Sequence, residues 1–270
     1  MRVALLFALG LSLLATSPVW AAADAPAQKP AAPILVSVHG AWAGGWQLSR
    51  VAPHLEGWGW KVYRPSLPGL GEHHHLASPA IGLEDHIQDI VNLILFENLH
   101  DVILLGHSYG GMVVTGVADR IPERIGRIIY LDAFLPEDGE SVMTLRRAGG
   151  GALERMTRDG FVIPTWVAPD KPFPKDVPHP LKTFTDPIIL KNQAAARRIP
   201  ALYILTVEEG KPAEADDFYA FAERARVRRW PVMVMAADHN PHWRKPAETA
   251  ALIESIVRLD QFAPLAKPAP

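Results

Sequence analysis

The chain contains no cysteine among its 270 residues. That absence excludes disulfide bonds, thiol catalysis and cysteine-ligated metal sites. Long runs of like charge are also missing, and the formal net charge is only −2. The sequence therefore offers neither a basic surface for nucleic acid nor a polybasic segment for a membrane. No internal repeat is present, and a composition of 49% hydrophobic and 21% charged residues fits a globular α/β domain with a deep core.

Only the N-terminus carries a long apolar run. Arg2 precedes about 13 apolar residues, Val3–Ala15, and the stretch Val19–Ala23 that follows ends in three alanines. A basic residue, a short apolar stretch and an Ala-x-Ala-like site are the parts of a secretory signal peptide. The apolar run is too short for a membrane span, which takes about 20 residues. We therefore expect residues 1–23 to be a signal peptide cleaved after Ala21 or Ala23, with export to the periplasm or the medium and no stable membrane anchor.

The rest of the chain alternates between strand and helix patterns. Residues 24–33 form an Ala/Pro-rich leader that we expect to be disordered. From residue 34 onward, apolar β-branched runs predict strands near residues 34–38, 60–64, 102–105, 127–131, 201–207 and 231–236. Helical spacing predicts helices near residues 47–55, 83–98, 109–120, 217–226 and 246–262. This alternation predicts an α/β fold over 34–270, with a mostly parallel central sheet flanked by helices.

Between the strand that ends near Leu131 and the strand that starts near Ala201, the regular pattern is lost. Prolines crowd this part of the chain, at positions 164, 169, 172, 174, 178 and 180. Proline removes a backbone donor, and it is poorly tolerated inside helices and central strands. We therefore predict an inserted cap over about residues 136–199 rather than additional sheet.

A glycine-rich motif lies between a predicted strand and a predicted helix. Residues 106–110 read Gly-His-Ser-Tyr-Gly, which matches the pattern G-x-S-x-G around Ser108. Such a serine lies on a sharp strand-to-helix turn, where flanking side chains would collide with neighbouring elements. A phosphate-binding glycine loop is the alternative, but no Walker-type lysine follows. The setting therefore favours Ser108 as a nucleophile.

A serine alcohol needs a base, and the loop after the last predicted strand supplies one. His239 comes first after that strand, near the edge of the sheet where the loops meet, and is the expected base. His242, three residues later, is expected in the loop or at the surface. His107 lies next to the serine and is interpreted as a packing or pocket residue.

Two carboxylates qualify as the acid that orients the histidine. Asp132 ends the strand near Leu131, and Glu209 follows the strand that begins at Ala201. Either residue gives the chain order serine, acid, histidine. Asp132 is preferred because its sequence surroundings are more apolar, and a desolvated carboxylate orients imidazole best.

Backbone amides and aromatic side chains complete the predicted site. The turn after the first strand places the Ala41 amide toward the serine, and the Tyr109 amide is the second expected oxyanion donor. Trp42, His107 and Trp166 are the predicted substrate-binding side chains. Glu72 and the three histidines after it do not form a metal site, because neighbouring side chains point apart. No metal and no cofactor are implied.

Taken together, these segments resemble the α/β-hydrolase superfamily, in particular its branch of small serine esterases that includes plant methyl-ester esterases and hydroxynitrile lyases. The matching segments are Val38–Trp42, Ser66–Gly71, Gly106–Gly111, Tyr130–Pro136 and Asp238–His239 with Pro246. The resemblance extends from about residue 34 to 262. It implies Ser108 as nucleophile and His239 as base. Plant members place the acid at the position of Glu209 and other branches at that of Asp132, so both alternatives stay open.

The signal-peptide pattern, the motif residues and the resemblance together predict an exported serine hydrolase that cleaves a small to medium, apolar carboxylic ester or lactone through an acyl-enzyme. Hydroxynitrile lyases of this type carry lysine at the position of Asn240 and threonine at that of Gly40, which disfavours cyanohydrin chemistry. Related dehalogenases and epoxide hydrolases use aspartate where this chain has Ser108. A lyase or C–C bond hydrolase with the same triad, and a non-catalytic ligand-binding protein, are the alternatives.

Overall fold

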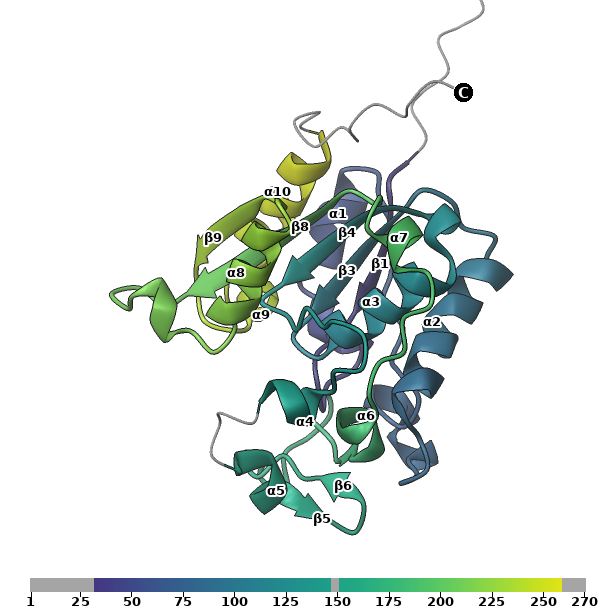
Figure 1. The fold of residues 1–270 in the computed structure, drawn as a ribbon. Coiled ribbons are helices and arrows are strands. Elements are labelled where there is room, and N and C mark those ends of the chain that lie inside the picture. The colour runs from purple at the N-terminus through teal and green to yellow at the C-terminus, as the bar shows by residue number, and fades with distance from the viewer. Residues whose placement is uncertain (1–31, 147–150, 259–270) are drawn as a thin grey trace, which may run out of the picture. The chain divides into compact units, whose positions relative to one another are not determined.

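The computed structural model describes residues 32–146 and 151–258 (Figure 1). The expected signal peptide and most of the expected leader fall in residues 1–31, outside the described residues. Within the described ranges, no helix is both long enough and apolar enough to cross a lipid bilayer.

A six-stranded parallel sheet forms the centre of the fold. Its strands are β1 (Ile34–Val38), β2 (Lys61–Tyr63), β3 (Val102–His107), β4 (Ile125–Leu131), β8 (Ala201–Val207) and β9 (Val232–Ala236), in the spatial order β2-β1-β3-β4-β8-β9. In register, Val38 pairs with Gly106, His107 with Leu131, and Val207 with Ala236. The carboxyl ends of the strands therefore meet at one edge of the sheet. The loops that carry the predicted site residues start at this edge.

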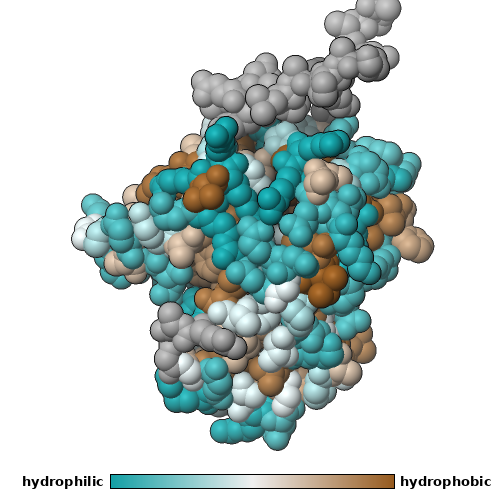
Figure 2. Space-filling view, in the orientation of Figure 1, coloured by the Kyte–Doolittle hydropathy of each residue, from teal (hydrophilic) through white to brown (hydrophobic). Residues whose placement is uncertain are grey.

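Alternating side chains along the strands form two hydrophobic cores, one on each face of the sheet. On β3, Leu104 belongs to one core, whereas Ile103 and Leu105 belong to the other. Helices α2 (Leu83–Phe96), α3 (Gly110–Arg120) and α8 (Tyr219–Val227) contribute to the first core, and α1 (Ala52–Gly57) and α10 (Pro246–Arg258) to the second. The predicted fold class is thus confirmed. On the outside, Figure 2 shows a largely hydrophilic surface with separate hydrophobic patches.

One predicted helix is wrong in its extent. The sequence pattern predicts a single helix over residues 47–55, but the chain forms a short 3-10 turn at Gly45–Leu48 and then the separate helix α1. Pro53 lies in the first turn of α1, where its missing N–H costs nothing. If α1 extended back through the preceding residues, Pro53 would lie inside the helix, where its missing N–H would interrupt the hydrogen-bond ladder. The helix therefore begins at Ala52.

The predicted cap insertion is confirmed between β4 and β8 (Figure 1). It contains the short helices α4 (Val142–Leu145), α5 (Ala152–Met156), α6 (Lys182–Thr185) and α7 (Gln193–Ala196). A small antiparallel sheet of β5 (Thr157–Arg158), β6 (Phe161–Val162) and β7 (His179–Pro180) lies between α5 and α6. The cap therefore has its own hydrogen-bonded framework despite its many prolines.

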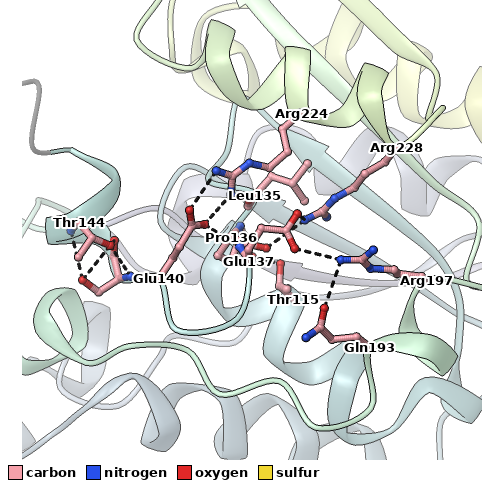
Figure 3. A network of polar contacts seen from close by, with 12 residues as sticks. Thr115, Leu135, Pro136, Glu137, Glu140, Thr144, Gln193, Arg197, Arg224 and Arg228 are labelled. Atoms are coloured by element: carbon pink, nitrogen blue, oxygen red, sulfur yellow. Dashed lines mark hydrogen bonds and ion pairs between the residues drawn. The ribbon is translucent and has the colours of Figure 1, made fainter.

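Ion pairs tie the start of the cap to the sheet domain (Figure 3). Glu137 and Glu140 follow β4, and they pair with arginines at the end of α8: Arg228, the C-cap residue, with Glu137 at 2.6 Å, and Arg224 with Glu140 at 3.0 Å. Arg197, just after α7, also pairs with Glu137 at 3.0 Å. One carboxylate thus joins both ends of the insertion to α8.

Glycines at the turn after β3 leave no room for a side chain. A Cβ added at Gly110 would lie 2.4 Å from the carbonyl oxygen of Val38, a backbone atom that cannot retreat. We expect Gly110→Ala to lower the free energy of unfolding by about 2–3 kcal/mol. At Gly57 nothing lies within 4 Å of the added Cβ, so Gly57→Ala is expected to stabilise by about 0.5 kcal/mol. Urea unfolding of both variants checks this, and equal effects would contradict it.

Five histidines among the described residues are buried, each no more than 3% exposed: His39, His86, His107, His179 and His242. Burial disfavours the charged imidazolium, which lowers the pKa of His39 to about 4 and the pKa of His86 and of His242 to about 3. Burial also lowers the pKa of His107 and of His179 well below the usual value. All five side chains are therefore neutral in the folded protein at neutral pH.

These lowered pKa values make stability depend on pH. Below about pH 6.5 the unfolded chain binds protons at these histidines while the folded chain does not, so the free energy of unfolding falls as pH falls. Each histidine contributes roughly 1.4 kcal/mol per pH unit down to its folded pKa. Urea titrations between pH 7.5 and 5 measure the slope. His242→Phe should reduce the slope by about one proton and the exposed His54→Gln should not; a flat profile would contradict the prediction.

Candidate active site

Ser108 lies on a left-handed turn directly after β3. Its backbone φ is 51°, a conformation that residues other than glycine rarely adopt. Its carbonyl oxygen accepts hydrogen bonds from the amides of Gly111 and Phe134, both at 3.1 Å. A Cβ at Gly111 would lie 2.0 Å from the Phe134 carbonyl oxygen, so glycine is required for this close approach. The turn thereby presents the half-buried Ser108 at the carboxyl edge of the sheet.

Asp132 and His239 are in direct contact. The Nδ1 atom of His239 donates to Oδ2 of Asp132 over 2.6 Å, and the Thr206 amide donates to Oδ1 over 3.0 Å. The Asp132 side chain is completely buried, whereas the His239 side chain is 38% exposed. The ring of His239 also stacks on Phe218, with centroids 4.8 Å apart. With Nδ1 committed to the carboxylate, the neutral ring keeps Nε2 as an acceptor, and His239 and Ser108 line the same cavity.

Glu209 lies elsewhere. It is exposed, in the turn after β8, and it is not among the residues that line this cavity. Of the two carboxylates that the sequence offers, the structure therefore brings Asp132 to His239 and leaves Glu209 in solvent.

In the turn after β1, the amides on either side of Ala41 donate to side chains. The Gly40 amide donates to Oε1 of Gln47 at 2.8 Å, and the Trp42 amide donates to Nδ1 of His179 at 3.0 Å. His39 Nδ1 donates to the Gly40 carbonyl at 2.8 Å, which fixes the Gly40–Ala41 peptide. Among the described residues, the amides of Ala41 and Tyr109 have no hydrogen-bond acceptor. Both residues line the cavity with Ser108, where a developing oxyanion would need donors.

The cavity has a volume of about 510 Å³. Aromatic and apolar side chains form much of its wall: Trp42, Tyr109, Phe134, Val142, Met143, Met156, Trp166, Phe184 and Phe218. Trp42 and Trp166, both predicted pocket residues, meet edge to face with ring centroids 4.9 Å apart. Charged side chains, among them Glu208, Lys211 and Asp216, also reach the wall. Sequence reasoning missed Phe218 and Asp216, because no motif marks the segment between β8 and α8.

Of the other two histidines near the site, His107 has the packing position that one interpretation gave it and not the predicted substrate-binding position, and His242 differs from its predicted place. His107 does not line the cavity: it is buried behind Ser108, and its Nε2 donates to the carbonyl oxygen of His239 at 2.7 Å. The surface position predicted for His242 is wrong, since the short helix α9 (Pro241–Arg244) turns its ring inward. The ring centroids of His242 and His107 lie 4.5 Å apart. No cluster of metal-ligating side chains occurs within the described residues.

Known proteins share segments of this sequence. An esterase of Nocardioides sp. (strain SG-4G), named carbendazim hydrolyzing esterase, is 52% identical over 110 residues. The match comprises 41% of this chain and 46% of that protein, so the chain spans less than half the length of this relative.

Solved structures share the fold over most of the chain. An extracellular α/β-hydrolase from a Paenibacillus species is 25% identical with a TM-score of 0.63, over 82% of this chain and 97% of that one. A methylesterase from Arabidopsis, 23% identical, has a TM-score of 0.64 over 83% and 98% of the two chains. Methylesterase 8 of Arabidopsis thaliana is 29% identical over 107 residues, 39% of each protein, which confirms the resemblance to plant methyl-ester esterases. A family profile described as "Alpha/beta hydrolase family" matches residues 35–252. With the serine turn, the parallel sheet and this match in agreement, the chain belongs to the alpha/beta hydrolase family.

Proposed function

We propose that the protein is a serine hydrolase that cleaves a small to medium, apolar carboxylic ester through an acyl-enzyme. The observation that carries the proposal is the 2.6 Å contact between the buried Asp132 and His239, which lines the same cavity as the strained Ser108. A nucleophile, a base and an orienting carboxylate in this arrangement activate a serine alcohol at neutral pH.

In the first half-reaction, the Oγ atom of Ser108 attacks the carbonyl carbon of the ester. Nε2 of His239 takes the hydroxyl proton, and the resulting imidazolium is stabilised by the Asp132 carboxylate. The charge on the former carbonyl oxygen is stabilised by the amides of Ala41 and Tyr109. When the tetrahedral intermediate collapses, the C–O bond of the alcohol breaks, and His239 returns the proton to the leaving oxygen. The acyl group remains bound to Ser108.

The second half-reaction repeats these steps with water. His239 removes a proton from water, which attacks the acyl carbonyl, and the same two amides stabilise the second oxyanion. Collapse releases the carboxylic acid and returns the proton to Ser108. This sequence needs only groups of the chain, the ester and water.

The cavity supports an apolar, ring-containing substrate. Its volume of about 510 Å³ is in the range of small-molecule pockets, and aromatic side chains such as Trp42 and Phe184 form its wall. Relatives are named carbendazim hydrolyzing esterase and pyrethroid hydrolase, so carbendazim and pyrethroids are candidate substrates to test. We further propose that the enzyme is exported, on the strength of the signal-peptide pattern in residues 1–23.

The test is hydrolysis of p-nitrophenyl acetate and butyrate, with carbendazim as a third substrate. Ser108→Ala should lose activity toward all three by at least about 1000-fold, because the nucleophile is gone. Ser255→Ala, whose hydroxyl bonds to a carbonyl within α10, should behave like the wild type. Only the wild type and this control should react with a fluorophosphonate probe.

An active Ser108→Ala variant would rule out the proposed function. Conversion of a cyanohydrin or a diketone by the wild type would favour the lyase or C–C hydrolase alternative.

The acid is tested by paired substitutions. Asp132→Asn should lower kcat by about 10⁴-fold, because an amide no longer holds the imidazole in the correct tautomer. Glu209→Gln should leave kcat within about twofold, since Glu209 is exposed and away from the cavity. Both variants are compared in steady-state ester hydrolysis. Loss of activity in the Glu209 variant alone would assign the acid to the other carboxylate.

A further inference from the structure

The cap binds both backbone polar groups of Trp42, a residue of the turn after β1. The amide of Trp42 donates to Nδ1 of His179 at 3.0 Å, and its carbonyl oxygen accepts from the Val177 amide at 2.8 Å. The indole Nε1 donates to the Val162 carbonyl at 2.9 Å. His179, Val177 and Val162 all belong to the cap and are each no more than 4% exposed. Trp42 is thus bonded to the cap at three polar atoms.

These contacts hold Trp42 in an unfavourable conformation. Its φ is 62°, in the left-handed region, which costs a residue with a large side chain on the order of 1–2 kcal/mol. Such a conformation persists only where the surroundings over-determine it. Within the turn itself, the side-chain acceptor Gln47 fixes the Gly40 amide but reaches no further. The cap therefore restrains the Ala41–Trp42 peptide, through the bond from the Trp42 amide to His179.

That restraint acts next to the Ala41 amide. Gln47 holds the His39–Gly40 peptide through the Gly40 amide, and His39 holds the Gly40–Ala41 peptide, which carries the Ala41 amide, through the Gly40 carbonyl. His179 fixes the Ala41–Trp42 peptide on the other side. Held from both sides, the Ala41 amide has no acceptor among the described residues and borders the cavity beside Ser108.

The chemical state of His179 suits an acceptor. Burial, with a smaller effect from the nearby His86 and His39, lowers the pKa of His179 well below its usual value. The ring is therefore neutral, and because Nδ1 accepts from Trp42, its proton resides on Nε2. Rings of Phe184 and Tyr109 pack against it with centroids at 4.6 and 4.9 Å. The Trp42 amide and these two rings hold the imidazole in place, and its Nε2 is buried with no hydrogen-bond partner among the described residues.

We propose that His179 of the cap is a positioning residue for catalysis, which locks the turn after β1 through the Trp42 amide and so aims the Ala41 amide at the substrate oxyanion. This inference rests on the proposed serine-hydrolase function. It assigns the cap a second task besides lining the cavity: the cap histidine holds the turn that carries one of the two proposed oxyanion donors.

The test replaces His179 with side chains that keep or lose the acceptor. Leucine removes it, asparagine keeps an oxygen near the position of Nδ1, and glutamine places its amide near that of Nε2. We expect His179→Leu and His179→Gln to lower kcat by about 10- to 100-fold, part of what one oxyanion donor supplies, with KM changed less than threefold. His179→Asn should recover most of kcat. Wild-type kcat in the leucine variant, or asparagine no better than glutamine, would overturn the proposal.

A control separates this role from general support of the cap. Thr157→Val removes a hydrogen bond inside the cap, from the Thr157 hydroxyl to the Leu153 carbonyl at 2.9 Å, without touching the turn. Its kcat should match that of the wild type. Thermal unfolding of each variant reports whether the cap region is intact, and the comparison of asparagine with glutamine holds even if leucine is not tolerated.

A second readout is independent of activity. In protein labelled with ¹⁵N-tryptophan, the Trp42 amide signal is assigned through Trp42→Phe, and its hydrogen exchange is measured. Exchange should be slow in the wild type and in His179→Asn, and at least tenfold faster in His179→Gln. Fast exchange in the wild type would overturn the proposed lock. If Ser108→Ala stays active while exchange follows this pattern, the proposed function fails and the lock itself stands.

Discussion

The site depends on the register between β3 and β4. His107 pairs with Leu131, so Ser108 and Asp132 are the first residues beyond two paired strand ends. Both leave their strands in the left-handed region, with φ values of 51° and 45°. The two sharp turns send the chain away from the sheet, while their side chains stay at its carboxyl edge. A shift of one residue in this pairing would move Asp132 away from His239 and reverse the faces of β4.

Layers of buried, neutral groups surround this edge. Behind the serine, His107 donates to the carbonyl of His239 and so anchors the loop that carries the candidate base. On the other side, His39 bonds the Gly40 carbonyl and accepts from the Leu67 amide at 3.0 Å. Each of these rings is fixed by a backbone group at a loop. Histidine suits this role because its two nitrogen atoms can join backbone segments that are far apart in the sequence.

Much of the fold and part of the site could be predicted from the sequence. The strand pattern and the G-x-S-x-G motif lead to the parallel sheet and to Ser108, because both signals are local. The choice between Asp132 and Glu209 is not local: each follows a strand, and only the pairing of β4 with β8 and the path of the last loop bring one of them to His239. The surface position predicted for His242 is wrong because the short helix Pro241–Arg244 directs its side chain inward. No periodic pattern marks His179, which lies in a proline-rich segment.

The bond between Trp42 and His179 joins residues 137 positions apart in the sequence. Contacts of such long range form late, since the intervening chain must be ordered before its ends meet. A chain whose sheet had formed but whose cap had not would therefore hold a serine turn without its finished oxyanion site. Under the proposed function, a molecule whose cap is not packed on this turn would be a poor ester hydrolase even with Ser108, His239 and Asp132 in place.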